Sequence, residues 1–153
     1  SDLNGSIACK VEALGNKDDL EKNKTDDFSI NITYNLKDST ESQMSYNHSD
    51  LVKVTIMPTF SNNVIAGNYE ITYVVPAGFR FIELDRKWPF WVEENGQKLR
   101  FFFHYDRQNF AAIPITFYIQ AAQKGEYTVD YVVIKENLET KLNYLDKATL
   151  SVK

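Results

Sequence analysis

The sequence predicts an all-β fold, an immunoglobulin-like antiparallel β-sandwich of roughly seven to nine strands. Apolar and polar residues alternate in several short segments, and polar segments suited to turns separate them. Phe, Trp and Tyr make up 14% of the 153 residues, a composition that favours β structure. No long segment has the periodicity of an amphipathic helix. A closed barrel is the structural alternative.

The predicted strands follow from period-two alternation, which places one set of side chains in a core and the other toward water. The clearest is residues 28–36, FSINITYNL. Pro58 cannot donate a ladder hydrogen bond, so that end of its strand lies at an edge or leaves the sheet. Residues 136–146 predict a helical turn or a long loop. The other expected strands cover residues 51–60, 69–75, 79–81, 113–121, 127–133 and 148–152.

Two turns punctuate the strands in the middle of the sequence. In YVVPAGFRF, residues 73–81, Pro76 ends ladder pairing and Gly78 permits a positive φ, which predicts a corner between two strands. Asn95-Gly96 lies between two strand-forming arms and predicts a hairpin with a type I′ turn.

The length corresponds to about one domain. We expect residues 28–153 to form the β-sandwich and residues 1–27 to be an N-terminal arm or linker, which can include one strand at 7–13. Residues 15–27 are charged and lack apolar periodicity, which predicts a solvated loop or linker.

Charge and hydropathy exclude two classes of partner. With 17 Lys and Arg against 21 Asp and Glu, the net charge is -4, and no dense basic run is present. Nucleic acid and anionic membranes are therefore not expected as partners. No apolar stretch reaches the roughly 20 residues of a membrane-spanning helix, and the start has no signal-peptide pattern, so we expect no direct membrane insertion.

Residues for catalysis are scarce, so we do not expect an enzyme. Cys9 is the single cysteine, which excludes an internal disulfide and a thiolate metal cluster. Glu12 follows it at the spacing of an internal thioester, but that chemistry needs Gln, because ammonia must leave from an amide. His48 and His104 form no paired zinc motif, and no nucleophile elbow or Gly-rich phosphate loop occurs. We predict no catalytic residue, no cofactor and no metal.

Aromatic residues surround the predicted hairpin, with Trp88, Phe90 and Trp91 before it and residues 101–103 and Tyr105 after it. Rings on alternate faces would fill the core on one side and form a platform on the other. A carbohydrate-binding module stacks sugars on such a platform. The interpretation that we favour is cross-strand packing or an interface within a larger protein.

Several motifs together resemble a known family. They are DLVKVTI at 50–56, YEITYVVPAGF at 69–79, ENGQKLRFFF at 94–103, ITFYIQAA at 115–122 and GEYTV at 125–129. These motifs are similar to those of the C-terminal macroglobulin-like domain of bacterial α2-macroglobulins, and the similarity extends over residues 28–153. A weaker similarity exists to the PAGF repeats of bacterial surface adhesins, which are also immunoglobulin-like.

The α2-macroglobulin resemblance implies a macroglobulin-type domain of a large secreted, periplasmic or cell-surface protease inhibitor. The domain would be non-catalytic, and it would pack against and shield the thioester domain of the parent chain. Its partners would be the neighbouring domains and, indirectly, a trapped protease. We expect the contact face to include Trp88, Trp91, His104 and Tyr105. An adhesin domain and a carbohydrate-binding module are the alternatives.

Overall fold

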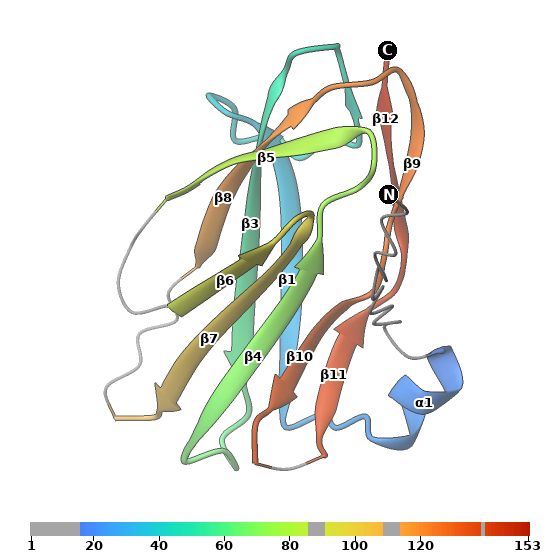
Figure 1. Cartoon of the computed structure of the whole chain (residues 1–153). Coiled ribbons are helices and arrows are strands. Elements are labelled where there is room, and N and C mark those ends of the chain that lie inside the picture. The colour runs from blue at the N-terminus through green and yellow to red at the C-terminus, as the bar shows by residue number, and fades with distance from the viewer. Residues whose placement is uncertain (1–15, 86–90, 109–113, 139) are drawn as a thin grey trace, which may run out of the picture.

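A computed structural model of the chain describes residues 16–85, 91–108, 114–138 and 140–153 (Figure 1). These residues form one short helix and twelve strands. The elements are α1 (Lys17–Lys22), β1 (Phe28–Leu36), β2 (Ser45–Tyr46), β3 (Leu51–Phe60), β4 (Ala66–Val74), β5 (Phe79–Asp85), β6 (Trp91–Asn95), β7 (Lys98–Asp106), β8 (Ile115–Ala121), β9 (Gly125–Val129), β10 (Val132–Glu136), β11 (Leu142–Leu145) and β12 (Ala148–Val152). No helix in this part of the chain is long and apolar enough to cross a membrane.

The strands form two main sheets that face each other across one core. One sheet has the order β1-β3-β8-β5 and the other the order β11-β10-β4-β7-β6. A third, smaller sheet has the order β2-β12-β9, and Figure 1 shows β9 and β12 running on beyond β10 and β11. Tyr46, Val129 and Leu150 of this third sheet belong to the same buried cluster as the residues between the two main sheets. The predicted immunoglobulin-like β-sandwich is therefore confirmed.

The strand count exceeds the prediction for reasons that lie in the tertiary structure. The segment predicted as one strand at 127–133 divides at Asp130, because β9 pairs with β12 whereas β10 pairs with β4 and β11. The prediction of a helical turn or a long loop at 136–146 is wrong, since residues 142–145 form β11 against β10. Both β11 and the two-residue β2 are too short for alternation to identify them.

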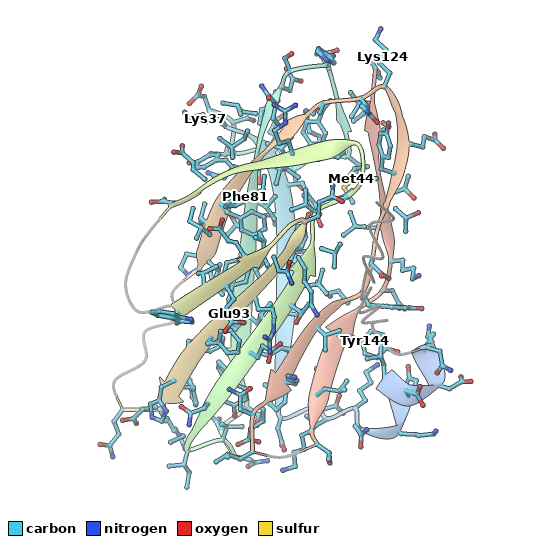
Figure 2. The ribbon with its side chains drawn as sticks, in the orientation of Figure 1. Lys37, Met44, Phe81, Glu93, Lys124 and Tyr144 are labelled. Atoms are coloured by element: carbon cyan, nitrogen blue, oxygen red, sulfur yellow. The ribbon has the colours of Figure 1, made fainter. Side chains whose placement is uncertain are left out.

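The charged segment at 15–27, predicted as a solvated loop or linker, contains α1. The Asn16 side chain caps this helix by accepting a hydrogen bond from the Asp19 backbone at 3.0 Å. Leu20 is buried against Val133 and Tyr144 on the outer side of β10 and β11. Figure 2 places Tyr144 beside the helix. One buried leucine gives no periodicity, so the sequence alone did not reveal the helix. The strand predicted at 7–13, with Cys9, lies outside the described residues.

The Pro-Ala-Gly corner carries the chain from β4 in one sheet to β5 in the other, as predicted. The predicted positive φ at Gly78 is wrong, because the φ of this residue does not lie in the positive region. A Cβ atom at Gly78 would lie 2.0 Å from Cε2 of Tyr127, a contact that no real side chain makes. The Tyr127 ring is held there by an edge-on contact with Phe79 and a 3.0 Å hydrogen bond from its hydroxyl to the Lys124 carbonyl. Glycine is thus required by the close approach of a ring.

The predicted hairpin joins β6 to β7, but its turn differs from the prediction. Asn95 pairs with Lys98, so the central residues are Gly96 and Gln97. Gly96 has a φ of 62°, and Gln97 is not among the residues with positive φ. A positive φ at the first central residue alone is the pattern of a type II′ turn, not of type I′. Pro58 lies in β3 and pairs with Ile30 of β1.

Replacing Gly78 with alanine should destabilise the domain through the Tyr127 ring. We expect Gly78→Ala to lower the free energy of unfolding by about 1 to 3 kcal/mol, because the ring must leave its site. In a double-mutant cycle with Tyr127→Ala, measured by urea denaturation, most of this loss should disappear. An equal loss in the presence and absence of the ring would contradict the steric explanation.

Candidate functional site

The expected contact residues do not all lie on one surface. Trp91 begins β6 with 71% of its surface exposed, and His104 is exposed on β7. Tyr105 is buried, with its ring stacked on Phe60 at a centroid distance of 3.9 Å, so its assignment to the contact face is wrong. The reason is the alternation along β7, in which neighbouring residues point to opposite faces. Trp88 lies outside the described residues.

Trp91 and His104, the two expected contact residues that are exposed, lie on the outer side of β4, β6 and β7. We call this surface the β6–β7 face. Strand pairing places Trp91 opposite Phe102, Glu93 opposite Arg100 and Asn68 opposite His104. Figure 2 places Glu93 on these strands. The face consists of Asn68, Glu70, Thr72, Trp91, Glu93, Arg100, Phe102 and His104. The other half of the same sheet's outer side, on β10 and β11, is covered by α1.

A buried carboxylate organises the centre of this face. Glu70 is only 4% exposed, and both of its oxygens accept hydrogen bonds from Arg100, from Nε and Nη2, each at 2.9 Å. Lys135 lies 3.2 Å from Oε2, and the Thr72 hydroxyl donates to Oε1 at 3.1 Å. Arg100 also donates to Glu93 at 2.7 Å. Four strands are thus tied together on one outer surface.

These contacts keep Glu70 ionised. Burial by itself raises the pKa of this carboxyl, but the hydrogen bonds and charges of Arg100 and Lys135 outweigh it and hold the pKa below its ordinary value of 4.5. The hydrogen bond with Glu70 likewise raises the pKa of the Arg100 guanidinium. The same guanidinium carbon lies 4.9 Å from the centroid of the Phe102 ring, so the ring is partly covered by a cation.

The polar groups of the β6–β7 face contact one another. His104 Nδ1 lies 2.9 Å from Asn68 Oδ1, a contact with an amide that has no role as an acid or a base. No group of three His, Cys, Asp or Glu residues in the described part of the chain could hold a metal ion. The carboxylate of Glu70 is occupied by three donor groups. The β6–β7 face can therefore offer an aromatic ring and fixed charges to a partner, which is what a binding surface requires.

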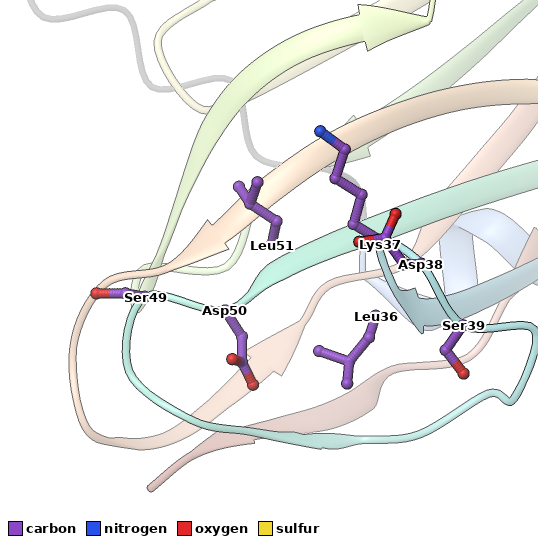
Figure 3. Close-up of a pocket in the computed structure, with 7 residues that line it drawn as sticks. All are labelled: Leu36, Lys37, Asp38, Ser39, Ser49, Asp50 and Leu51. Atoms are coloured by element: carbon purple, nitrogen blue, oxygen red, sulfur yellow. The ribbon is translucent and has the colours of Figure 1, made fainter.

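A hollow lies elsewhere, between the loops that flank β1 and β3 (Figure 3). Its volume is about 500 Å³, and it is lined by Leu36, Lys37, Asp38, Ser39, Ser49, Asp50 and Leu51. Asp50 accepts a hydrogen bond from the Asn47 backbone at 2.7 Å and so holds its own loop. The neighbouring Ser49 has a φ of 74°. The Ser49 hydroxyl lies 2.9 Å from Nδ1 of His48 in the same loop.

The two facing sheets define an immunoglobulin-like β-sandwich domain. No family model and no curated protein matches the sequence. Among solved structures, the chain is similar to native α2-macroglobulin of Escherichia coli, spanning domain MG7 to the C-terminus, with a TM-score of 0.68 and 13% identity over 84% of this chain. The cryo-EM structure of the native E. coli protein gives a TM-score of 0.67 and 12% identity, again over 84% of this chain.

This likeness shows that the chain has the fold of a part of α2-macroglobulin, as the sequence motifs predicted. The chain spans 24% of the length of the first structure and 9% of the second. At this identity the similarity concerns the fold, and the activity of the whole protein does not follow from it.

The buried position of Glu70 predicts a pH-dependent contribution to stability. Its folded pKa is lowered, so the contribution is present above pH 4.5 and lost as the pH falls through the folded value. At neutral pH, Glu70→Gln should lower the free energy of unfolding by about 1 to 3 kcal/mol, because charged hydrogen bonds are lost. Denaturant unfolding from neutral to acidic pH should show that the difference from the wild type shrinks.

Glu94→Gln is the matched control, since Glu94 is exposed on β6 of the same sheet and makes no ion pair with the described residues. It should leave the stability unchanged. Equal effects of the two substitutions would contradict the role assigned to Glu70.

Proposed function

We propose that this chain is a non-catalytic domain of an α2-macroglobulin-like protease inhibitor. In this proposal it lies near the C-terminus of a larger secreted, periplasmic or cell-surface protein. It packs against the thioester-bearing domain of that protein and shields the thioester before activation. Its direct partners are the neighbouring domains, and a trapped protease is an indirect one.

Two independent observations support the family assignment. The motifs at 50–56, 69–79 and 94–103 resemble those of the bacterial domain. The backbone, compared without regard to those motifs, is similar to a part of the E. coli protein over 84% of the chain. A sequence resemblance and a fold similarity that point to the same family support each other more than either does alone.

The observation that carries the docking role is the exposure of Trp91. An indole with 71% of its surface in water is costly in a domain that works alone, and large aromatic residues are enriched at the centres of protein interfaces. Around it, the Glu70–Arg100 pairs fix the surface, so little side-chain entropy would be lost on docking. A preformed surface of this kind suits packing against another domain.

A sugar platform is less well supported by the geometry. The alternation predicted rings on both faces of the hairpin, and three of them, Phe101, Phe103 and Tyr105, are buried in the core. On the outer face, Phe102 is partly covered by the Arg100 guanidinium. Among the described residues of this face, Trp91 is therefore the aromatic ring on which a sugar could stack.

The test uses the parent protein with its thioester intact. Trp91→Ala should weaken the packing of this domain by about 30-fold, equivalent to the loss of an anchor residue worth 2 kcal/mol. The measurement is the rate at which a small amine, methylamine, reacts with the thioester in the absence of protease, and this rate should rise. Leu138→Ala is the control, since Leu138 is 87% exposed but lies in the β10–β11 turn. A parent chain without a thioester domain would refute the proposal.

A further inference from the structure

On the outer edge of β6, the backbone groups of two residues have no hydrogen-bond partner in the part of the chain that the structure describes. The Val75 backbone donates to the Gln97 carbonyl at 2.8 Å, and the Arg107 backbone donates to the Ile65 carbonyl at 2.9 Å. Odd-numbered residues of β7 therefore direct their backbone groups toward β4, and even-numbered ones toward β6.

The pairing of β6 follows from this alternation. Trp91, Glu93 and Asn95 are opposite the even-numbered residues of β7, so their backbone groups bond to it. The N–H and C=O groups of Val92 and Glu94 must then point away from the sheet. No hydrogen bond within the described part of the chain reaches either residue. The edge of β6 thus offers two donors and two acceptors in the spacing of a strand.

Two other edges of the sandwich, those of β11 and β5, are covered or interrupted. At the opposite end of the same sheet, residues 23–25 cover β11, since the Thr25 backbone donates to Leu142 at 2.9 Å and the Leu142 backbone donates to Asn23 at 3.0 Å. On the side of β6, the edge strand of the other sheet is β5, and a bulge between Phe81 and Glu83 interrupts its pairing. Covering segments and bulges are the usual means by which proteins block strand addition.

We propose that β6 accepts an added strand, an extended antiparallel segment of a partner polypeptide. The inference rests on the proposed function, because it specifies how a docking domain would hold its neighbour. Backbone hydrogen bonds to Val92 and Glu94 give the attachment, and the side chains of β6 select the sequence.

The side chains of β6 define what the segment must carry. Glu94 is exposed, has no ion-pair partner among the described residues and faces the same side as Leu99. A Lys or Arg opposite it would neutralise this charge. Val92 is half-buried at the margin of the core, so an apolar residue opposite it would extend the core. Trp91, on the outer face, would pack beside an apolar or aromatic residue. The partner is therefore an extended segment with a basic residue opposite Glu94 and apolar residues opposite Val92 and Trp91. In the direction of the partner chain, the apolar residues follow the basic one after a single intervening residue.

The test uses this chain with the peptide acetyl-Thr-Lys-Thr-Ile-Val-Thr-amide. In the antiparallel register, its Lys lies opposite Glu94 and its Ile opposite Val92. We expect the amide resonances of Val92 and Glu94 to shift most in proton–nitrogen spectra. At a peptide concentration of twice the Kd, their exchange with deuterated water should slow about threefold, because two thirds of the edges are occupied.

Two peptides and two variants provide the controls. The same peptide with N-methyl groups on its Lys and Ile cannot donate to the edge and should not bind. A peptide with Glu in place of Lys should bind more weakly. Glu94→Gln should reduce the affinity and its salt dependence, whereas Glu94→Pro, which removes an outward N–H without touching the bonds to β7, should abolish binding.

Binding that survives N-methylation, or resonance shifts confined to strands other than β6, would overturn the inference. So would the absence of binding by the unmodified peptide. If the peptide fails while Trp91→Ala still exposes the thioester in the parent protein, strand addition is wrong and the proposed docking function stands. If the peptide binds and the parent has no thioester domain, the proposed function fails and the strand-accepting edge remains.

Discussion

The pairing register between β4 and β7 is the constraint on which the rest of this structure depends. It places Tyr69 opposite Phe103 and Tyr73 opposite Leu99 on the core side. The same register brings Glu70 and Arg100 together on the outer side. Because side chains alternate with a period of two, a slip of one residue would move the aromatic residues into water and the ions into the core. One register therefore determines both the core and the β6–β7 face.

The ion pairs on the outer side contribute more to the selection of this β4–β7 register than to the free energy of unfolding. A buried carboxylate loses hydration that its partners only partly restore, so such a pair adds little net stability over apolar residues of the same size. In a register shifted by one residue, however, Glu70 and Arg100 would lie on opposite faces, and Glu70 would be left buried without its partner. The pair thus disfavours alternative pairings, and it also fixes the charges beside Trp91 and Phe102. A surface that is rigid for structural reasons is then available for recognition.

The interior of this domain is an ordinary sandwich core, so the proposed docking function rests on its surfaces and edges. Many immunoglobulin-like domains share this architecture and have unrelated roles, so the likeness to a part of α2-macroglobulin concerns the fold. What distinguishes this chain is an asymmetric sheet. The half formed by β10 and β11 is covered by α1 and by residues 23–25, whereas the half formed by β6 and β7 carries an exposed indole. In the proposed docking, a neighbouring domain would contact the half of the sheet that carries Trp91 and not the half that α1 covers.

The sequence by itself determined the all-β class, most of the strands, the hairpin at Gly96 and the corner at Pro76, because alternation and turn residues are local signals. It also identified Trp91 as a surface candidate. It placed Tyr105 on the wrong side, because its neighbours in the run of aromatic residues at 101–105 are too alike to show which face each occupies. Only the tertiary structure decided the buried ion pair of Glu70, the packing of α1 through Leu20, the division of 127–133 between two sheets and the position of β6 as the last strand of its sheet. Each of these depends on which strands lie side by side, and that information arises from contacts between segments far apart in the chain.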